Sequence, residues 1–138
     1  MHVLDTDTLT HLIRGHPRVV ERATPVAADI FVTMVTRIEQ LRGRFDAVFK
    51  AENGENLLRA HLRLIETEND LSRIPMLPID AAVAAEFDRL RTNKKLMKIG
   101  RGDLLIAAIT LANRATLVTR NLKDFRLVPG LPVENWVD

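Results

Sequence analysis

Short apolar runs of strand type alternate along this chain with longer segments whose apolar residues recur at helical spacing. The strand-like runs are 2–4, 30–35, 74–79, 116–119 and 133–135, and the helical segments are 8–14, 17–23, 36–49, 56–68, a helix capped by Asp80, and 102–114. This alternation predicts an α/β fold, a sandwich with a central, mainly parallel sheet flanked by helices. With 138 residues and no linker or repeat, the chain is expected to be one domain, 1–138.

Three acidic residues stand where a predicted strand passes into a helix or in the first turn of such a helix. Asp5 directly follows the first strand, Glu39 lies early in the helix expected from Thr36, and Asp103 opens the apolar helix after I-G-R-G. In a parallel sheet these transitions share one edge, where ligands bind. Clustered carboxylates repel one another unless a cation lies between them, and oxygen ligands suit Mg²⁺ or Mn²⁺. The pattern therefore predicts a metal site at that edge.

Each acid also has a simpler structural interpretation. Asp5 is placed to cap the following helix, and Thr36 and Glu39 have the spacing of a capping box. Asp103 would complement the dipole of its helix, and Asp124 taken alone is a surface turn residue. The metal-site prediction therefore depends on the acids converging at one edge.

The distribution of positive charge is more informative than the net charge of +2. No acid interrupts the segment that carries Arg89, Arg91, Lys94, Lys95, Lys98 and Arg101. Such a stretch can neutralise the phosphates of a nucleic acid, although a solvated helix face explains it equally well. Together with a metal and carboxylates, a polyanionic substrate indicates phosphodiester chemistry.

Other chemistries lack the residues that they require. The chain has no cysteine, its one serine is Ser72, and its four histidines show no H-E-x-x-H spacing. Neither a Walker A loop nor G-x-G-x-x-G is present. There is no apolar run of membrane-spanning length, and the segment MHVLDTDT does not resemble a signal peptide, so we expect a cytoplasmic protein without membrane association.

Nearly the whole chain resembles a PIN domain of the VapC type, the toxin component of VapBC toxin–antitoxin pairs. The matching segments are V-L-D-T-D-T-L, T-M-V-T-R-I-E-Q-L-R-G, I-G-R-G-D-L-L-I-A-A and the tail L-V-T-R-N-L-K-D-F-R-L-V-P-G-L-P-V-E-N-W. The resemblance implies endoribonuclease activity with Mg²⁺, or alternatively Mn²⁺. It also implies an RNA substrate, a homodimer and inhibition by a cognate antitoxin protein.

The resemblance also implies roles for individual residues. Asp5, Glu39 and Asp103 would form the catalytic acidic cluster, with Asp5 and Asp103 as direct metal ligands. Family members often carry aspartate where this chain has Asn121, and Asp124 is the nearest acid that can replace it. The residues expected to contact substrate are Thr6, Lys94, Lys95, Lys98, Arg101, Thr119 and Asn121.

Two other functions remain open from the sequence. The segment Asp5-Thr6-Asp7 imitates the D-x-D start of haloacid-dehalogenase-type phosphatases, but Leu9 stands where that motif has threonine or valine, and no late acidic pair follows. A non-catalytic module that binds RNA or a protein partner would need the acids only as helix caps. Metal-dependent RNA cleavage distinguishes the favoured prediction from both.

Overall fold

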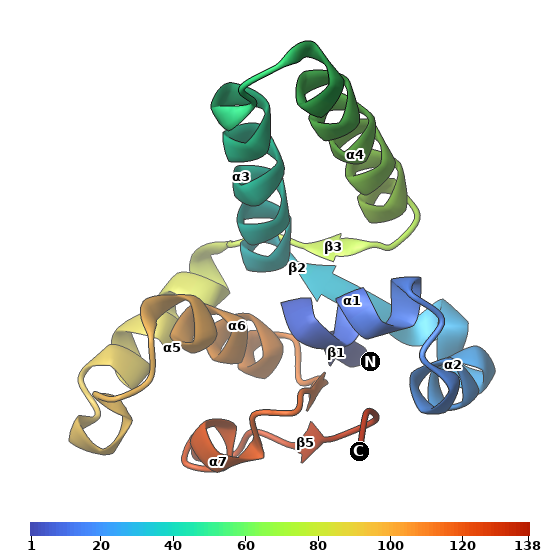
Figure 1. The fold of residues 1–138 in the computed structure, drawn as a ribbon. Helices are drawn as coiled ribbons and strands as arrows, with labels where there is room; N and C mark the ends of the chain where they lie inside the picture. Colours follow the sequence, from blue (N-terminus) through green and yellow to red (C-terminus); the bar gives the residue numbers. More distant parts are fainter.

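All 138 residues are described by a computed structural model, in which five short strands are interleaved with helices (Figure 1). The elements in chain order are β1 (His2–Leu4), α1 (Thr6–Ile13), α2 (Pro17–Ala23), the 3-10 helix η1 (Thr24–Asp29), β2 (Ile30–Thr33), α3 (Met34–Lys50), α4 (Gly54–Ser72), β3 (Met76–Leu77), α5 (Ala81–Arg91), the 3-10 helix η2 (Lys94–Leu96), α6 (Arg101–Ala112), β4 (Thr116–Val118), α7 (Leu122–Phe125) and β5 (Val133–Glu134).

The strands form one sheet in the order β3-β2-β1-β4-β5, and every pairing is parallel. The α/β fold with a mainly parallel sheet is therefore confirmed. Strand β1 lies in the centre, with His2 opposite Ile30 of β2 and Thr116 of β4. Because the strands are parallel, the residues after β1, β2 and β4 all emerge at one edge. We call this the carboxyl edge.

Successive residues of the central strands point to opposite faces of the sheet. Val3 and Leu117 belong to one core cluster, which includes most of α6, and Leu4 and Val118 belong to a second that includes Trp136. All four strand residues are fully buried. Helices thus cover both faces of the sheet, as the continuous hydrophobicity of its parallel strands requires.

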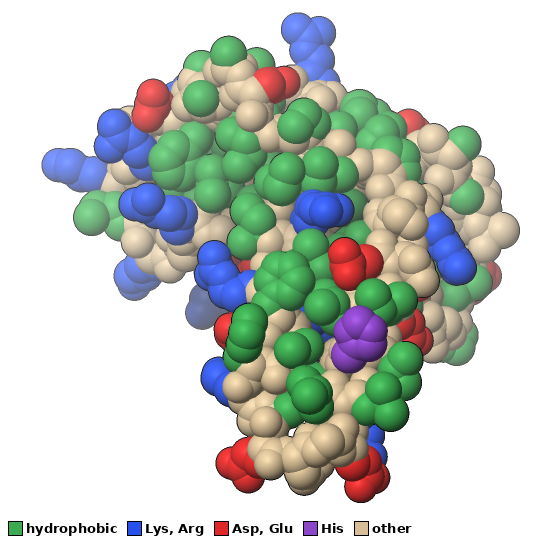
Figure 2. Space-filling model, turned by 90° about the horizontal axis from the view of Figure 1, so that it is seen from above, with side chains coloured by type: hydrophobic (Ala, Val, Ile, Leu, Met, Phe, Trp, Pro, Cys, Tyr) green, Lys and Arg blue, Asp and Glu red, His purple; other side chains and the backbone are tan.

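Helices α3 and α4 form a hairpin that extends away from the sheet (Figure 1). The sequence pattern places Leu58, Leu62 and Ile65 on one face of α4, and the structure leaves all three exposed. Phe45 and Phe49 on α3 are also exposed, Phe49 by 89%. Apolar side chains gather on this side of the molecule in Figure 2. We call these five residues the hairpin face.

The start of α3 differs from the capping-box prediction. The strand ends at Thr33, and the Thr33 hydroxyl caps the helix by accepting a hydrogen bond from the Thr36 backbone N–H at 3.3 Å. The predicted Thr36–Glu39 capping box is therefore wrong, because two further residues of the apolar run are helical. The side chains of Thr36 and Glu39 are consequently available for contacts with another segment.

None of the helices combines the length and apolar character needed for a membrane span.

Candidate active site

Asp5 lies at the carboxyl edge directly after the central strand. Its backbone N–H donates to the carbonyl of Val118 on β4 at 3.1 Å, which fixes the residue between the two strands. One carboxylate oxygen, Oδ1, accepts a hydrogen bond from the Thr8 backbone N–H at 2.8 Å. Asp5 therefore does cap α1, as the simpler interpretation held. The cap engages Oδ1, so Oδ2 remains for another ligand.

Glu39 is brought to the same edge by a hydroxyl relay. The Thr6 hydroxyl donates to Glu39 Oε1 at 2.8 Å and lies 3.0 Å from the hydroxyl of Thr36. Because Thr6 has one hydroxyl proton and gives it to Glu39, Thr36 is the donor in the second hydrogen bond. The fully buried Thr36 thus orients Thr6, and Thr6 orients Glu39. Sequence reasoning assigned Thr36 to a helix cap and did not identify this contact.

Asp103 reaches the carboxyl edge because α6 leads into β4 and starts near the end of that strand. Burial raises the pKa of Asp103 above its ordinary value. The negative charges of Glu39, Asp5 and Asp124, in that order, raise the pKa further, while the Asn121 amide lowers it. The four predicted acids therefore interact electrostatically although they lie on four separate chain segments.

The fourth segment of the site follows β4. Thr119 is fully buried, and its hydroxyl accepts a hydrogen bond from the Asn121 backbone N–H at 3.0 Å. Asn121 caps the short helix α7, and its Nδ2 donates to Asp124 Oδ2 at 3.1 Å. The turn predicted at 121–125 is thus helical, which directs Asp124 back toward the strand edge. The side chains of Asn121 and Asp124 are half-buried, and both change the pKa of Asp103. Either residue is therefore close enough to fill the fourth position of the site.

These acids do not form a closed metal-binding cluster. Nowhere do three or more histidine, cysteine, aspartate or glutamate side chains converge closely enough to hold one ion. Three of the four carboxylates accept hydrogen bonds from neighbours instead: Asp5 from Thr8, Glu39 from Thr6 and Asp124 from Asn121. The donor set still suits Mg²⁺, which keeps several waters and needs only one or two carboxylates. A cation would also relieve the mutual repulsion that raises the pKa of Asp103.

The basic stretch divides into paired and unpaired charges. Arg89 forms an ion pair with Glu86 at 2.6 Å and Arg91 with Asp88 at 3.0 Å, each one helical turn earlier. In contrast, the exposed residues Lys94, Lys95, Lys98 and Arg101 have no acidic partner in the structure. Arg101 is the first residue of α6, two positions before Asp103. The sequence analysis counted too many free positive charges in this stretch, because Glu86 and Asp88 pair with Arg89 and Arg91.

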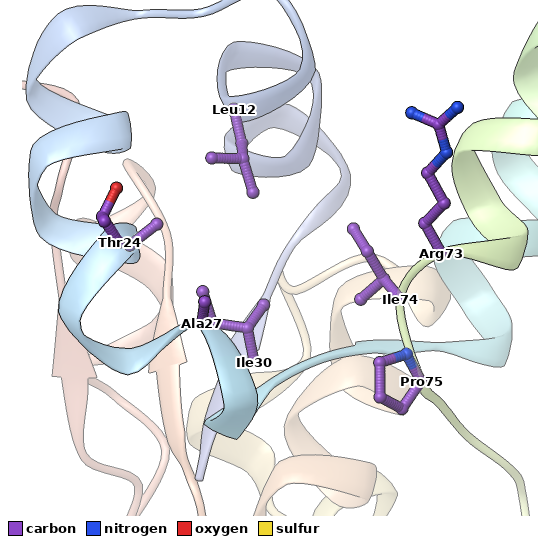
Figure 3. A pocket seen from close by; sticks show the side chains of 8 residues that line it. Leu12, Thr24, Ala27, Ile30, Arg73, Ile74 and Pro75 are labelled. Atoms are coloured by element: carbon purple, nitrogen blue, oxygen red, sulfur yellow. The ribbon is translucent and has the colours of Figure 1, made fainter.

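Figure 3 shows a mainly apolar pocket of about 240 Å³, whose lining contains none of these acids. Leu12, Ala27 and Ile74 line it, and its other residues include Ile30 and Pro75, which lie at the starts of β2 and β3. The pocket is thus near the amino ends of the strands, opposite the carboxyl edge. No carboxylate lines it, so it is not the candidate active site.

The fold and this acidic edge define a PIN domain: the PIN-domain family model matches residues 2–131, and the chain belongs to that family. Ribonuclease VapC2 of Rickettsia felis is 30% identical, covering 99% of this chain and 98% of the relative. The tRNA(fMet)-specific endonuclease VapC of Salmonella typhimurium is 26% identical, covering 97% and 96%. The DNA-bound VapBC structure from Salmonella typhimurium matches with a TM-score of 0.79 and 25% identity, over 98% of this chain and 97% of that one. The VapC resemblance expected from the sequence is confirmed.

We predict that Asp124 contributes more to metal affinity than Asn121. Asp124 carries a full negative charge and acts on Asp103, whereas the neutral Asn121 amide is a weaker ligand for a divalent ion. Titration of Asp124→Asn with Mn²⁺ should give a dissociation constant raised by about tenfold, within the range for outer partners of a metal. Asn121→Ala should bind nearly as well as the parent. The assignment is wrong if Asn121→Ala loses the metal and Asp124→Asn retains it.

Proposed function

We propose that this protein is a metal-dependent endoribonuclease of the VapC type, the toxin of a toxin–antitoxin pair. The observation that carries the proposal is the convergence of Asp5, Glu39, Asp103 and Asp124 from four chain segments at the carboxyl edge. Burial and the charges of the other three acids raise the pKa of Asp103 there. Four acids from separate segments within electrostatic reach are costly to a fold unless they bind a cation. The names of the relatives support ribonuclease activity, and the deduced donor set supports Mg²⁺, with Mn²⁺ as the alternative.

In this proposal Asp5 and Asp103 hold the metal directly, and Asp124 contributes charge. When bound, the cation would neutralise a phosphate oxygen and lower the pKa of an attacking water. Glu39 is oriented by Thr6 through Oε1, and its Oε2 has no hydrogen-bond partner in the protein. Glu39 Oε2 is therefore free to orient the attacking water and accept its proton. Gly102 leaves space beside this oxygen, because a Cβ there would lie 3.9 Å from it.

The two alternatives from the sequence are not supported. The PIN-domain match and the relatives named as ribonucleases do not support a haloacid-dehalogenase-type phosphatase. Asp7, the second acid of the imitated motif, is exposed and lies 3.8 Å from Arg120. A purely structural role as helix caps accounts for Asp5, but it leaves the convergence of Glu39 and Asp103 unexplained.

The proposed test compares RNA cleavage with and without a divalent cation. Purified protein is incubated with total RNA in Mg²⁺, in Mn²⁺ and in excess chelator, and the fragments are resolved by gel electrophoresis. Cleavage should occur with either metal and should cease in the chelator. Equal cleavage in the chelator would contradict the metal-dependent mechanism, and no cleavage under any condition would contradict the activity. We propose that the protein acts on RNA in the cytoplasm.

The unpaired lysines are proposed to guide RNA toward the acids. Replacing Lys94, Lys95 and Lys98 with glutamine should weaken RNA binding because three positive charges are lost. The slope of log Kd against log salt should fall by up to about 2, at about 0.7 per contact with single-stranded RNA. An unchanged slope in an anisotropy titration would show that the lysines are only solvated. The matched control replaces Lys50, Arg59 and Arg63 on the hairpin with glutamine, which removes the same number of positive charges elsewhere.

The hairpin face supports the proposal of an antitoxin partner. Leu58, Leu62 and Ile65 repeat at helical spacing and are 60, 59 and 43% exposed. Exposed apolar side chains that gather on one side of a molecule are characteristic of a protein interface (Figure 2). The solved structures similar to this chain include VapBC complexes. A small protein encoded beside the gene and co-purifying with this chain would support the partner, while the homodimer stays a prediction for size measurement in solution.

A further inference from the structure

A polar hollow opens beside the acidic cluster, and one positively charged side chain, that of Arg120, lines it. Its volume is about 390 Å³, and it is lined by Asp5, Asp7, Arg120, Asn121 and Asp138, with no apolar side chain. Asp5 and Asn121 are also part of the candidate active site, so the hollow continues from it. Neither the sequence pattern nor the proposed mechanism gives Arg120 a role. A lone guanidinium among carboxylates is the feature that requires explanation.

The backbone around Arg120 is held firmly. The Thr119 N–H donates to the Glu134 carbonyl on β5 at 2.8 Å, and its hydroxyl accepts from the Asn121 N–H at 3.0 Å. Thr119 is fully buried, and Asn121 caps α7. Arg120 lies between these two fixed residues and its side chain extends into the hollow. Its Cα position relative to Asp5 is therefore set by the sheet.

The Arg120 side chain, in contrast, is held loosely. Its Nη1 lies 3.8 Å from Asp7 Oδ2, and its Nε lies 3.5 Å from Asp138 Oδ2. Charge-assisted hydrogen bonds are usually about 2.7–2.9 Å long. The three side chains are 46, 49 and 62% exposed, and exposed ion pairs contribute little to stability. The guanidinium can therefore exchange a carboxylate partner for a stronger one.

We propose that Arg120 binds a backbone phosphate of the RNA strand next to the cleavage position, and that Asp7 and Asp138 compete for it when RNA is absent. The inference rests on the proposed ribonuclease function. A guanidinium presents paired donors that match two phosphate oxygens, which neither of these single long contacts offers. The hollow shares Asp5 with the metal site, so a phosphate on Arg120 belongs to a nucleotide adjoining the reacting one. Arg120 is thus a substrate-positioning residue.

The test measures RNA binding separately from cleavage. A fluorescein-labelled single-stranded RNA of mixed sequence is titrated with Asp103→Asn protein in Mg²⁺, so that binding is measured in a variant designed not to cut. Adding Arg120→Ala should raise Kd about tenfold and reduce the salt slope by about 0.7. Arg120→Lys should retain the slope but lose affinity, because its point charge cannot engage two oxygens. Arg63→Ala, exposed on α4, is the control for net charge.

Asp7 and Asp138 are proposed to compete with RNA for Arg120, so removing their charges should strengthen RNA binding. Asp138→Asn should lower Kd several-fold, because the guanidinium is then less occupied, and Asp7→Asn should act in the same direction. In the otherwise unchanged protein, Arg120→Ala should raise KM more than it lowers kcat. The proposal is wrong if Arg120→Ala binds RNA like Arg63→Ala, or if it only increases Mn²⁺ affinity by removing a positive charge. RNA cleavage by the parent with unaltered binding in Arg120→Ala would overturn this inference and leave the proposed function intact.

Discussion

Replacing Asp103 with asparagine should reduce metal-dependent RNA cleavage by more than about 100-fold. Mutating a residue that only hydrogen-bonds to a metal ligand typically lowers metal affinity or activity by about 10–100-fold. Asp103 is proposed as a direct ligand, so its loss should have a larger effect. Asparagine has nearly the same size, so the packing of α6 should be unchanged. Initial rates on one RNA substrate, measured at saturating Mg²⁺ for both proteins, check the prediction.

The same substitution should raise the stability of the metal-free protein at neutral pH. The pKa of Asp103 is raised in the folded state, so the folded protein holds this proton more strongly than the unfolded chain. Stability from this group therefore falls as pH rises from the ordinary pKa of 3.8 through the raised one. Asparagine does not ionise, so Asp103→Asn does not lose this stability as the pH rises. Thermal melts from pH 4 to 8 should show a higher melting temperature for Asp103→Asn at the upper end.

Added Mg²⁺ provides an internal control for both measurements. It should raise the melting temperature of the parent, because the ion binds the folded state, and should have little effect on Asp103→Asn. Asp46→Asn, an exposed carboxylate on α3, removes the same charge away from the site and should behave like the parent. Cleavage by Asp103→Asn at the parental rate would exclude a role for this residue in the reaction.

Two substitutions at Asp5 should separate its structural role from its catalytic one. Asparagine and aspartate cap helices about equally well, so Asp5→Asn should keep the hydrogen bond from the Thr8 N–H and the stability of α1. Asp5→Ala loses that cap and should cost about 1 kcal/mol of unfolding free energy. Both variants should lose cleavage by more than about 100-fold, because both remove a charge from the proposed metal site.

Denaturant melts and cleavage rates of the two variants decide this prediction together. Thr33→Ala is the matched control, because it removes a cap at the start of α3 and leaves every site carboxylate in place. It should lose stability by a similar amount. An Asp5→Asn protein that cuts RNA normally would reduce Asp5 to a helix cap, the simpler interpretation of the sequence.

Hydrophobic periodicity predicted the elements and their order, because the strands are continuously apolar and the helices repeat at 3.6 residues. Helix ends were harder to predict. Thr33 and Thr36 are both suitable N-caps, and only the register of β2 determines that Thr33 is used. The length of α4 was underestimated, because its start is polar and the polar run 66–70 interrupts the apolar pattern before the buried Leu71.

The acids of the site could be predicted because Asp5 and Glu39 follow strands that end at one edge, and Asp103 opens a helix that leads back into the next strand. The contacts that orient them could not. The hydroxyl relay from Thr36 through Thr6 to Glu39 joins residues 30 and 33 positions apart, and no local spacing reveals it. Arg120 was missed for a related reason: its acidic neighbours Asp7 and Asp138 come from opposite ends of the chain.

The central position of β1 has a consequence during synthesis. Strand β1 pairs with β4, which is made after more than a hundred further residues. Long-range pairing of this kind also makes folding slow. Asp5 cannot meet Asp103 and Asp124 until those segments have left the exit tunnel, so a nascent chain has no complete nuclease site. The nuclease activity therefore arises only after the segment that carries Asp124 has been made.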